Sequence, residues 1–230
     1  MRITVISDTH KKHHQLTNDL IGGDLIIHAG DISSMGTIEE IADFCNWYNS
    51  LKGYSASVFI AGNHDWGFQK NPIQTRGLVN SFEWITYLQD SSMVFMNHEG
   101  DESCKIWGPP WQPEFFNWAF NLPRNGEDLK EKWFWIPNDT DILVTHGPPY
   151  GILDMSSYGG VNAGCELLME SVSVKKPKIH IFGHIHSAFG YKYHNGTHFI
   201  NASMLDERYN YSRKPLTFDW NPQTNELEFV

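Results

Sequence analysis

Short apolar runs alternate with polar loops along the first third of the chain. The runs at residues 2–7, 24–28 and 57–61 each have the length of a buried strand and end in polar residues. Between the last two runs, apolar side chains in residues 37–51 recur at the spacing of a helix, namely Ile38, Ile41, Phe44, Cys45 and Tyr48. The order strand, loop, helix, strand predicts βαβ units and a mostly parallel sheet.

The middle of the chain changes character. Short strands are expected at residues 85–88, 93–97 and 104–107, with a turn at residues 99–101. Residues 107–123 are rich in aromatic side chains and proline, which predicts a packed surface loop. A helix is expected after this loop, at residues 127–135.

Strands and helices alternate again in the last third. Strands are predicted at residues 141–145 and 178–182, with a helix at residues 163–174 between them. Residues 189–193 and 197–200 flank His194-Asn195-Gly196, and Asn-Gly is typical of a type I′ hairpin turn. Two further strands, at residues 216–220 and 226–230, close a second sheet. No repeat or linker divides the chain, so we expect one domain over residues 1–230.

Composition excludes several classes of protein. The 230 residues are 40% hydrophobic and 19% charged, which disfavours both a disordered chain and a membrane protein. No apolar run has the 18 residues of a transmembrane helix, and the first residues turn polar too soon for a signal peptide. The three cysteines are unevenly spaced, which argues against a disulfide framework or a cysteine zinc site. We therefore expect a cytoplasmic protein with no membrane association.

Charge limits the partners. Lys and Arg number 17 against 27 Asp and Glu, a net charge of -10, and the longest basic stretch is residues 174–178. Long nucleic acid is a poor partner for such a surface, because neutralising phosphates requires clustered positive charge. The charge does not exclude a small phosphate ester that binds through metal ions.

Five predicted strands end in residues that bind metal ions. They are Asp8-Thr9-His10, Gly30-Asp31, Gly62-Asn63-His64-Asp65, His146-Gly147 and Gly183-His184-Ile185-His186. Each motif alone is also compatible with an ordinary turn. Because ligands of open α/β sheets bind at the carboxyl ends of the strands, all five motifs are expected to meet at one edge.

Such a cluster indicates metal. Burying these polar groups without partners costs several kcal/mol in total, by an order-of-magnitude estimate. Carboxylate and imidazole ligands suit Mn, Fe and Zn, and thiolate is absent from the motifs. Seven ligands are too many for one ion but suit two ions that share an aspartate, about 3.5–4 Å apart, as in enzymes that displace a group at phosphorus.

The motifs resemble those of the calcineurin-like metallophosphoesterases. Further segments look like the metallophosphoesterase-domain-containing branch of that superfamily, which is similar to class III cyclic-nucleotide phosphodiesterases. These segments are residues 107–113, 118–124, 141–149 and 200–203. The resemblance implies an α/β (mixed α+β) fold, a four-layer αββα sandwich of two mixed sheets flanked by helices.

The resemblance also implies roles. Asp8, His10, Asp31 and His186 would hold the first metal, and Asp31, Asn63, His146 and His184 the second. A bridging hydroxide would attack phosphorus, His64 would protonate the leaving oxygen, and Asn63 and His64 would contact substrate. The ions would be Mn, Fe or Zn, with Mn favoured in vitro.

Two positions depart from the wider superfamily. Ser34 stands where many members carry an Asp that orients the catalytic histidine, so His64 must be supported by Asp65 or by a backbone carbonyl. Some members of the branch lack the first histidine of the last motif, whereas this chain keeps His184. We therefore expect a fully ligated metal pair and robust activity.

The expected function is a phosphodiesterase acting on small esters, cyclic nucleotides or nucleotide esters. A phosphomonoesterase, a nuclease and a non-catalytic scaffold on the same fold are the alternatives, and the oligomeric state, monomer or homodimer, stays open. The remaining polar residues are assigned ordinary roles. We expect core positions for His28 and His180, solvent-facing positions for His98, His194 and His198, and surface packing rather than substrate contact for Arg124 and Tyr150. His13 and His14 are expected to lie near the site, with substrate contact as the less favoured role.

Overall fold

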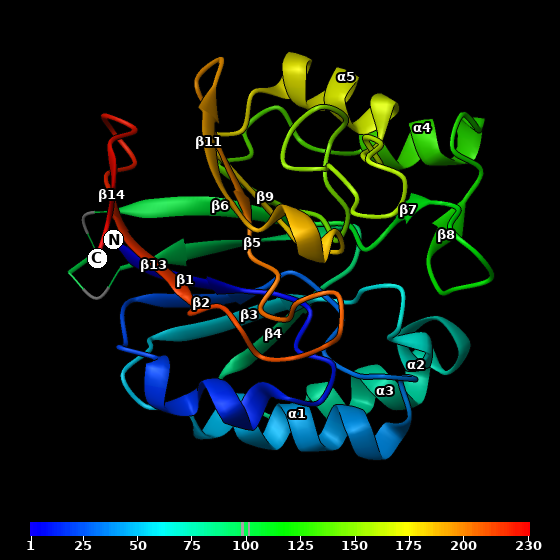
Figure 1. The fold of residues 1–230 in the computed structure, drawn as a ribbon. Helices are drawn as coiled ribbons and strands as arrows, with labels where there is room; N and C mark the ends of the chain where they lie inside the picture. Colours follow the sequence, from blue (N-terminus) through cyan, green and yellow to red (C-terminus); the bar gives the residue numbers. More distant parts are fainter. Residues whose placement is uncertain (98, 101) are drawn as a thin grey trace.

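Two mixed sheets pack face to face and carry helices on their outer faces (Figure 1). The structure is a computed structural model that describes residues 1–97, 99–100 and 102–230. Helices α1 and α3 lie below the first sheet in Figure 1, and α4 and α5 lie above the second. The four-layer αββα sandwich expected from the sequence is confirmed.

The first sheet is parallel at its centre. Its strand order is β14-β13-β1-β2-β3-β4, in which β1 to β4 run parallel, β13 runs antiparallel to β1 and β14 antiparallel to β13. The strands are β1 (Arg2–Ile6), β2 (Leu25–His28), β3 (Ala56–Ile60), β4 (Ile85–Leu88), β13 (Leu216–Trp220) and β14 (Leu227–Phe229).

The second sheet has the order β11-β12-β10-β9-β6-β5, with antiparallel strands at both edges and parallel strands between them. The strands are β5 (Ser91–Met96), β6 (Ser103–Gly108), β9 (Ile142–Val144), β10 (Ile179–Phe182), β11 (Gly190–His194) and β12 (Thr197–Asn201). A separate short pair is formed by β7 (Gln112–Pro113) and β8 (Asn121–Leu122).

The helices are short, and none of those in the described part of the chain combines the length and apolar character needed to cross a membrane. They are η1 (His13–Asp19), α1 (Ile38–Ser50), α2 (Trp66–Lys70), α3 (Pro72–Val79), α4 (Glu127–Phe134), α5 (Glu166–Lys175) and η2 (His186–Ala188). Thr37 caps α1, because its hydroxyl accepts a hydrogen bond from the Glu40 amide at 3.3 Å.

Side chains of the central strands alternate between two buried faces. On β2, Leu25 and Ile27 point into the core between the sheets, whereas Ile26 packs on the helix side near Phe44. On β9, Leu143 belongs to the corresponding core beneath α4 and α5. Because both faces are buried, these strands read as nearly continuous apolar runs in the sequence.

Most predicted elements are confirmed within a few residues. The last two strands, β13 and β14, were expected to close the second sheet, but they extend the first sheet through β1. Helices α2 and α3 were not predicted, because Gly67, Pro72 and Gly77 interrupt the apolar pattern of residues 66–79. The loop expected at residues 107–123 contains the short pair β7 and β8. The turn expected at residues 99–101 includes Asp101, which lies outside the described residues, as does His98.

One histidine prediction is wrong. His198 was expected to face solvent, but it is buried on β12, between Tyr191 and the end of the chain. Its Nδ1 is 2.9 Å from the Tyr191 hydroxyl, and its Nε2 is 2.8 Å from the Asn225 carbonyl oxygen. The segment after β13 covers this ring, and strand periodicity does not predict that cover. His28 and His180 are fully buried, as expected.

Candidate metal centre

The five sequence motifs meet at one edge of the sandwich. Three of them follow β1, β2 and β3 of the first sheet, and two follow β9 and β10 of the second. The structure thereby brings together all eight residues predicted for the site, namely Asp8, His10, Asp31, Asn63, His64, His146, His184 and His186. Residues that are remote in the sequence form one site because the carboxyl ends of both sheets coincide.

The backbone of these motifs is strained and tightly packed. Asp8, Asp31 and His184 adopt left-handed φ values of 54°, 57° and 66°, which cost free energy and cluster at functional sites. A Cβ atom on Gly183 would lie 2.0 Å from Asp8 Oδ2, and one on Gly62 would lie 2.3 Å from Asp31 Oδ1. Glycine is required at both positions because no side-chain atom fits beside the carboxylates.

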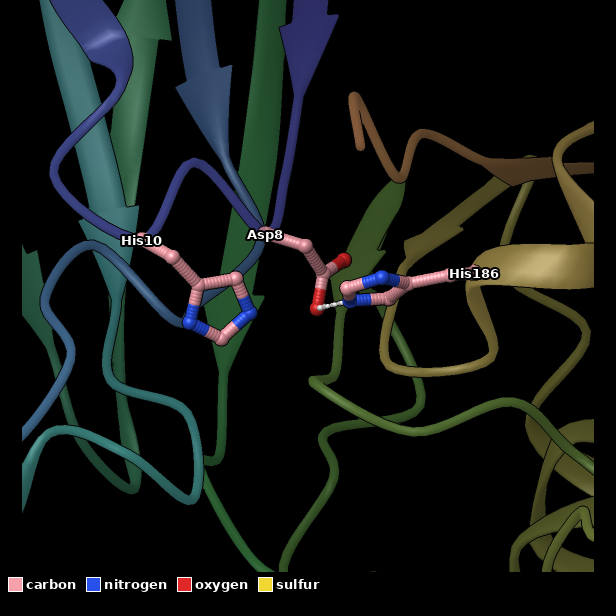
Figure 2. A group of neighbouring side chains, drawn as sticks. All are labelled: Asp8, His10 and His186. Atoms are coloured by element: carbon pink, nitrogen blue, oxygen red, sulfur yellow. Dashed lines mark ion pairs between the residues drawn. The ribbon is translucent and has the colours of Figure 1, made fainter. Parts of the chain in front are cut away.

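The first cluster consists of Asp8, His10 and His186 (Figure 2). The ring of His186 faces the Asp8 carboxylate, with Nε2 3.5 Å from Oδ1, and the ring of His10 lies on the other side of that carboxylate. The three potential ligand atoms lie within 4.8 Å of one another. His10 Nε2 also lies 3.6 Å from Asp31 Oδ2.

The second cluster consists of Asp31, His146 and His184. His146 Nε2 is 3.3 Å from Asp31 Oδ2 and 2.9 Å from the side-chain oxygen of Asn63. The rings of His146 and His184 have their centroids 5.0 Å apart. Asp31 contacts histidines of both clusters, so its carboxylate lies between them.

Electrostatics favours ionised carboxylates in both clusters. Burial raises the pKa of Asp8 and of Asp31, but the surrounding histidines outweigh burial and hold both pKa values below their usual range. Burial lowers the pKa of His10 to about 4 and that of His184 to about 3, so both rings are neutral and can donate a lone pair.

His146 behaves differently. Burial lowers its pKa, but the Asp31 carboxylate outweighs burial and raises the pKa to about 9. The centre therefore stabilises positive charge next to Asp31.

Backbone carbonyls orient two of the rings. His146 Nδ1 donates to the Ala29 carbonyl at 3.0 Å, and His186 Nδ1 donates to the Asp206 carbonyl at 3.0 Å. Since a carbonyl only accepts, each bond requires a proton on Nδ1 and turns Nε2 towards the cluster. This arrangement is common for histidines that bind metal.

These residues fit a pair of metal ions. His10 Nε2 is buried, and it has no hydrogen-bond partner within the described part of the chain. A bound cation would give this imidazole nitrogen a partner beside the two carboxylates. The ligand types of the clusters, imidazole, carboxylate and amide oxygen, suit Mn, Fe or Zn. The shared Asp31 carboxylate occupies the place of a bridging ligand.

His64 lies beside the two clusters, and one of its ring nitrogens is within 4.8 Å of potential ligand atoms of His10 and Asp31. Its Nδ1 donates to the Ser34 carbonyl at 2.8 Å, which is the backbone support that replaces the missing Asp. The indole of Trp118 stacks on the ring, with centroids 4.1 Å apart and planes inclined by 30°. His10 packs against its edge at 4.7 Å. The Nδ1 atom of His64 is thus held by a hydrogen bond, and Nε2 is available to a molecule bound in the cavity.

Asp65 braces the loops instead of supporting His64. Its buried carboxylate accepts from the amides of Ile32, Ser33 and Gly62 at 3.3, 3.0 and 2.7 Å, and from the Ser33 hydroxyl at 2.5 Å. Burial and the neighbouring Asp31 carboxylate raise the pKa of Asp65 to about 6. The residue joins the loops that carry Asp31 and Asn63.

A cavity of about 870 Å³ opens over the clusters. Its lining includes five aromatic residues of which the sequence analysis named none as functional, namely Phe115, Phe116, Trp118, Tyr158 and Tyr209. The aromatic content of residues 107–123, which predicted a packed surface loop, is the signal that could have identified the first three. No local signal marks Tyr158 or Tyr209, which reach the cavity only through the tertiary fold.

The other polar candidates are placed by their contacts. Arg124 lines the cavity, but its guanidinium is occupied by Glu166 at 2.7 Å and by the carbonyls of Ala163 and Gly164. The described lining of the cavity includes neither Tyr150 nor His13 and His14.

The sandwich and its edge clusters define a metal-dependent phosphoester hydrolase. Comparison with known proteins makes this class specific, because the model of the calcineurin-like phosphoesterase family matches residues 1–188. The chain belongs to that family, whose members carry a dinuclear centre of divalent metal ions. Strands β11 to β14 follow the matched region and complete both sheets.

Individual relatives agree with the family. A metallophosphoesterase domain-containing protein 1 of Homo sapiens is 34% identical over 239 residues, which cover 95% of this chain and 70% of the relative. A protein of Nostoc sp. named 3′,5′-cyclic-nucleotide phosphodiesterase is 26% identical over 190 residues, covering 78% of this chain and 61% of the relative.

Solved structures share the fold. A Thermus thermophilus protein superposes with a TM-score of 0.64 at 14% identity, over 100% of this chain and 97% of its own. A dimetal phosphatase from Danio rerio superposes with a TM-score of 0.55 at 10% identity, over 95% of this chain and 92% of its own. At these identities the likeness concerns the fold alone.

Proposed function

We propose that this protein is a dinuclear metal-dependent phosphodiesterase that hydrolyses small phosphodiesters, cyclic nucleotides or nucleotide esters. The observation that carries the proposal is the position of His64, whose ring is fixed at Nδ1 and lines the same cavity as the two metal-binding clusters. A histidine so placed can protonate the leaving oxygen of an ester bound over the clusters.

In this proposal Asp8, His10 and His186 hold one ion, and Asn63, His146 and His184 hold the other. Asp31 contacts histidines of both groups and would be the ligand that the two ions share. When bound, such ions lower the pKa of water and neutralise charge on the phosphate. The backbone carbonyls of Ala29 and Asp206 keep two of the ligand rings in the orientation that binding requires.

His64 serves as the general acid. Because the Ser34 carbonyl holds the Nδ1 proton, only Nε2 exchanges its proton in the cavity. Trp118 covers one face of the ring and His10 packs on its edge, so the imidazole has little freedom to rotate. Asn63 precedes His64 in the same loop and accompanies it at the substrate.

Charge supports a diester rather than a monoester. Arg124 is the one guanidinium or ammonium side chain among the described residues that line the cavity, and Glu166 already neutralises it. Glu114 and Glu207 also line the cavity. A phosphodiester carries one negative charge, whereas a monoester dianion carries two and gains more from additional cations.

Aromatic side chains support an ester with a flat organic group. Phe115, Phe116 and Tyr158 are exposed at the cavity by 51%, 76% and 82%. Large exposed rings beside a binding site offer a surface on which a nucleobase or an aryl group can stack. The name of the Nostoc relative, a cyclic-nucleotide phosphodiesterase, points in the same direction.

The test is a substrate panel on metal-stripped protein before and after addition of Mn²⁺. The panel holds 2′,3′-cAMP, 3′,5′-cAMP, bis-p-nitrophenyl phosphate and p-nitrophenyl phosphate. We expect Mn²⁺-dependent turnover of the diesters above that of the monoester. A preference for the monoester would assign a phosphatase instead, and metal binding without turnover of any ester would contradict the proposal.

His64→Ala separates acid catalysis from metal binding. Loss of the general acid should lower turnover of the cyclic nucleotides by about 10²–10⁴-fold and leave the metal content unchanged. The aryl diester should lose less, because p-nitrophenolate leaves without a proton. His194→Gln, which removes an exposed histidine at the end of β11, is the matched control. Loss of metal in His64→Ala would reassign this residue as a ligand.

A further inference from the structure

A second group of potential metal ligands lies outside the catalytic cavity. It consists of His13 and His14 at the start of η1 and Asp43 in the middle of α1. Each residue offers one ligand atom, and the three atoms lie within 4.8 Å of one another. The described residues that line the cavity do not include any of the three, so this cluster is separate from the centre at the strand ends.

Both imidazoles direct Nε2 at the same carboxylate. His13 Nε2 is 3.3 Å from Asp43 Oδ2, and His14 Nε2 is 3.4 Å from Asp43 Oδ1. N–H···O bonds are shorter, about 2.7–3.2 Å. Zinc bonds to nitrogen and oxygen of about 2.0–2.1 Å in a tetrahedral arrangement hold neighbouring ligand atoms about 3.3–3.4 Å apart. The His14 contact also counts as a long hydrogen bond, and both spacings match the edges of a tetrahedral zinc site.

The burial of His13 needs an explanation. Its side chain has 0% exposure, and neither ring nitrogen has a hydrogen-bond partner within the described ranges. The ring packs on Trp47, with centroids 4.9 Å apart, and on Phe44 at 5.6 Å. A buried polar ring without a hydrogen bond costs free energy, whereas an aromatic residue would fill the same space without that cost. A cation at Nε2 would satisfy the ring.

We propose that His13, His14 and Asp43 bind one divalent cation of the zinc type. Two imidazoles and one carboxylate form a set that suits Zn²⁺ and its neighbours in the transition series, and disfavours Mg²⁺ and Ca²⁺, which prefer oxygen. His14 and Asp43 are exposed by 60% and 50%, so the site opens to solvent and water completes the coordination.

Such an ion would join the loop after the first motif to helix α1. Lys11 already reaches Glu40 of α1 at 3.3 Å, and the cluster adds a second connection a few residues further along the chain. The segment between His10 and η1 is thereby held at both ends. The ion is structural in this proposal, and hydrolysis does not require it.

Metal content tests the proposal. Wild type, His14→Gln and Asp43→Asn are dialysed against Zn²⁺, and bound zinc per chain is measured by mass spectrometry. Both variants should carry one zinc ion fewer than wild type. His194→Gln removes another exposed histidine elsewhere and should retain the wild-type count. Because the altered side chains lie at the surface, both variants are expected to fold.

Two further measurements separate this site from the catalytic centre. The rise in thermal midpoint on adding Zn²⁺ should be smaller in His14→Gln than in wild type, because a cation that binds only the folded state stabilises it. Phosphoester hydrolysis by His14→Gln should equal that of wild type. An equal zinc count in wild type and both variants, with equal midpoint shifts, would overturn the proposal whatever the outcome of the substrate panel.

Discussion

Asp65 is a residue whose role follows from its hydrogen bonds alone. The carboxylate accepts four bonds from the two loops that carry Asp31 and Asn63, and all four donors are close to it. A carboxylate offers only acceptors, which is the chemistry that this ring of amide and hydroxyl donors requires. The residue therefore positions two metal ligands without contacting a metal itself.

Asp65→Asn should destabilise the protein, because the new amide group would point donors at backbone donors. We expect a loss of about 1.5–3 kcal/mol in the free energy of unfolding, the range for hydrogen bonds to a charged group. Urea denaturation at neutral pH measures it. Asp139→Asn, which removes an exposed carboxylate paired with Lys105, is the control and should change stability little. Equal midpoints for the two variants would contradict the role assigned to Asp65.

At the scale of elements, the strand β10 carries a histidine, His180, among apolar side chains. Its ring contacts Thr145 through Nε2 at 2.8 Å, and the Thr145 hydroxyl donates to the Gly147 carbonyl. That hydroxyl must therefore accept from His180, which fixes the proton on Nε2 and leaves Nδ1 bare. Nδ1 has no partner in the described part of the chain, so the ring cannot take a second proton without cost.

His180 should make stability depend on pH. Burial lowers its pKa from 6.5 to about 3, so the unfolded chain binds a proton that the folded chain rejects. The contribution of the neutral His180 ring to the free energy of unfolding is fully present above pH 6.5. It is lost as the pH falls towards 3, at ~1.4 kcal/mol per pH unit. His180→Gln keeps a donor for Thr145 and does not titrate, so its stability should fall less between pH 6.5 and 5.

Urea denaturation of chelator-treated proteins at a series of pH values measures this difference. The chelator is needed because acid also releases metal from the candidate centre. His194→Gln, which alters an exposed histidine at the end of β11, should follow the wild-type profile. A His180→Gln profile parallel to that of wild type would show that protonation of this strand does not limit acid stability.

At the scale of the whole molecule, the metal centre joins the two sheets. Asp8 and Asp31 follow strands of the first sheet, whereas His146 and His184 follow strands of the second. Contacts across the edge include the bond from the His184 amide to Asp8 Oδ2 at 3.0 Å. Ions bound there would hold the two halves of the sandwich together in addition to the shared apolar core.

Metal removal should therefore lower both activity and stability. We expect chelation to abolish phosphoester hydrolysis and to lower the thermal midpoint, since each ion at 100 times its Kd adds about 2.7 kcal/mol. The measurement is made in the His14→Gln background to exclude the surface cluster. Asp31→Asn in that background should be insensitive to chelator. If the His14→Gln protein with Asp31 intact lost its metal and kept the same thermal midpoint, metal binding would not contribute to stability.

The apolar runs predicted the βαβ units and a mostly parallel sheet, because strands buried on both faces stand out in the sequence. The four-layer sandwich was implied by the family resemblance of the motifs. The sequence pattern missed α2 and α3, whose apolar residues are interrupted by glycine and proline, and it misplaced His198, which a distant segment covers. The expectation of one domain over residues 1–230 stays a prediction. All three cysteines are described, and each is buried with a free thiol.

By itself, the sequence determined which residues stand at the strand ends, because a motif that closes an apolar run is a local feature. Only the tertiary structure decided how those residues are grouped. The two clusters that share Asp31, the Ser34 carbonyl beneath His64 and the meeting of His13 with Asp43 all join segments that no local pattern connects. Side chains from different elements are brought within bonding distance by the packing of sheets and helices, and that packing depends on the whole chain.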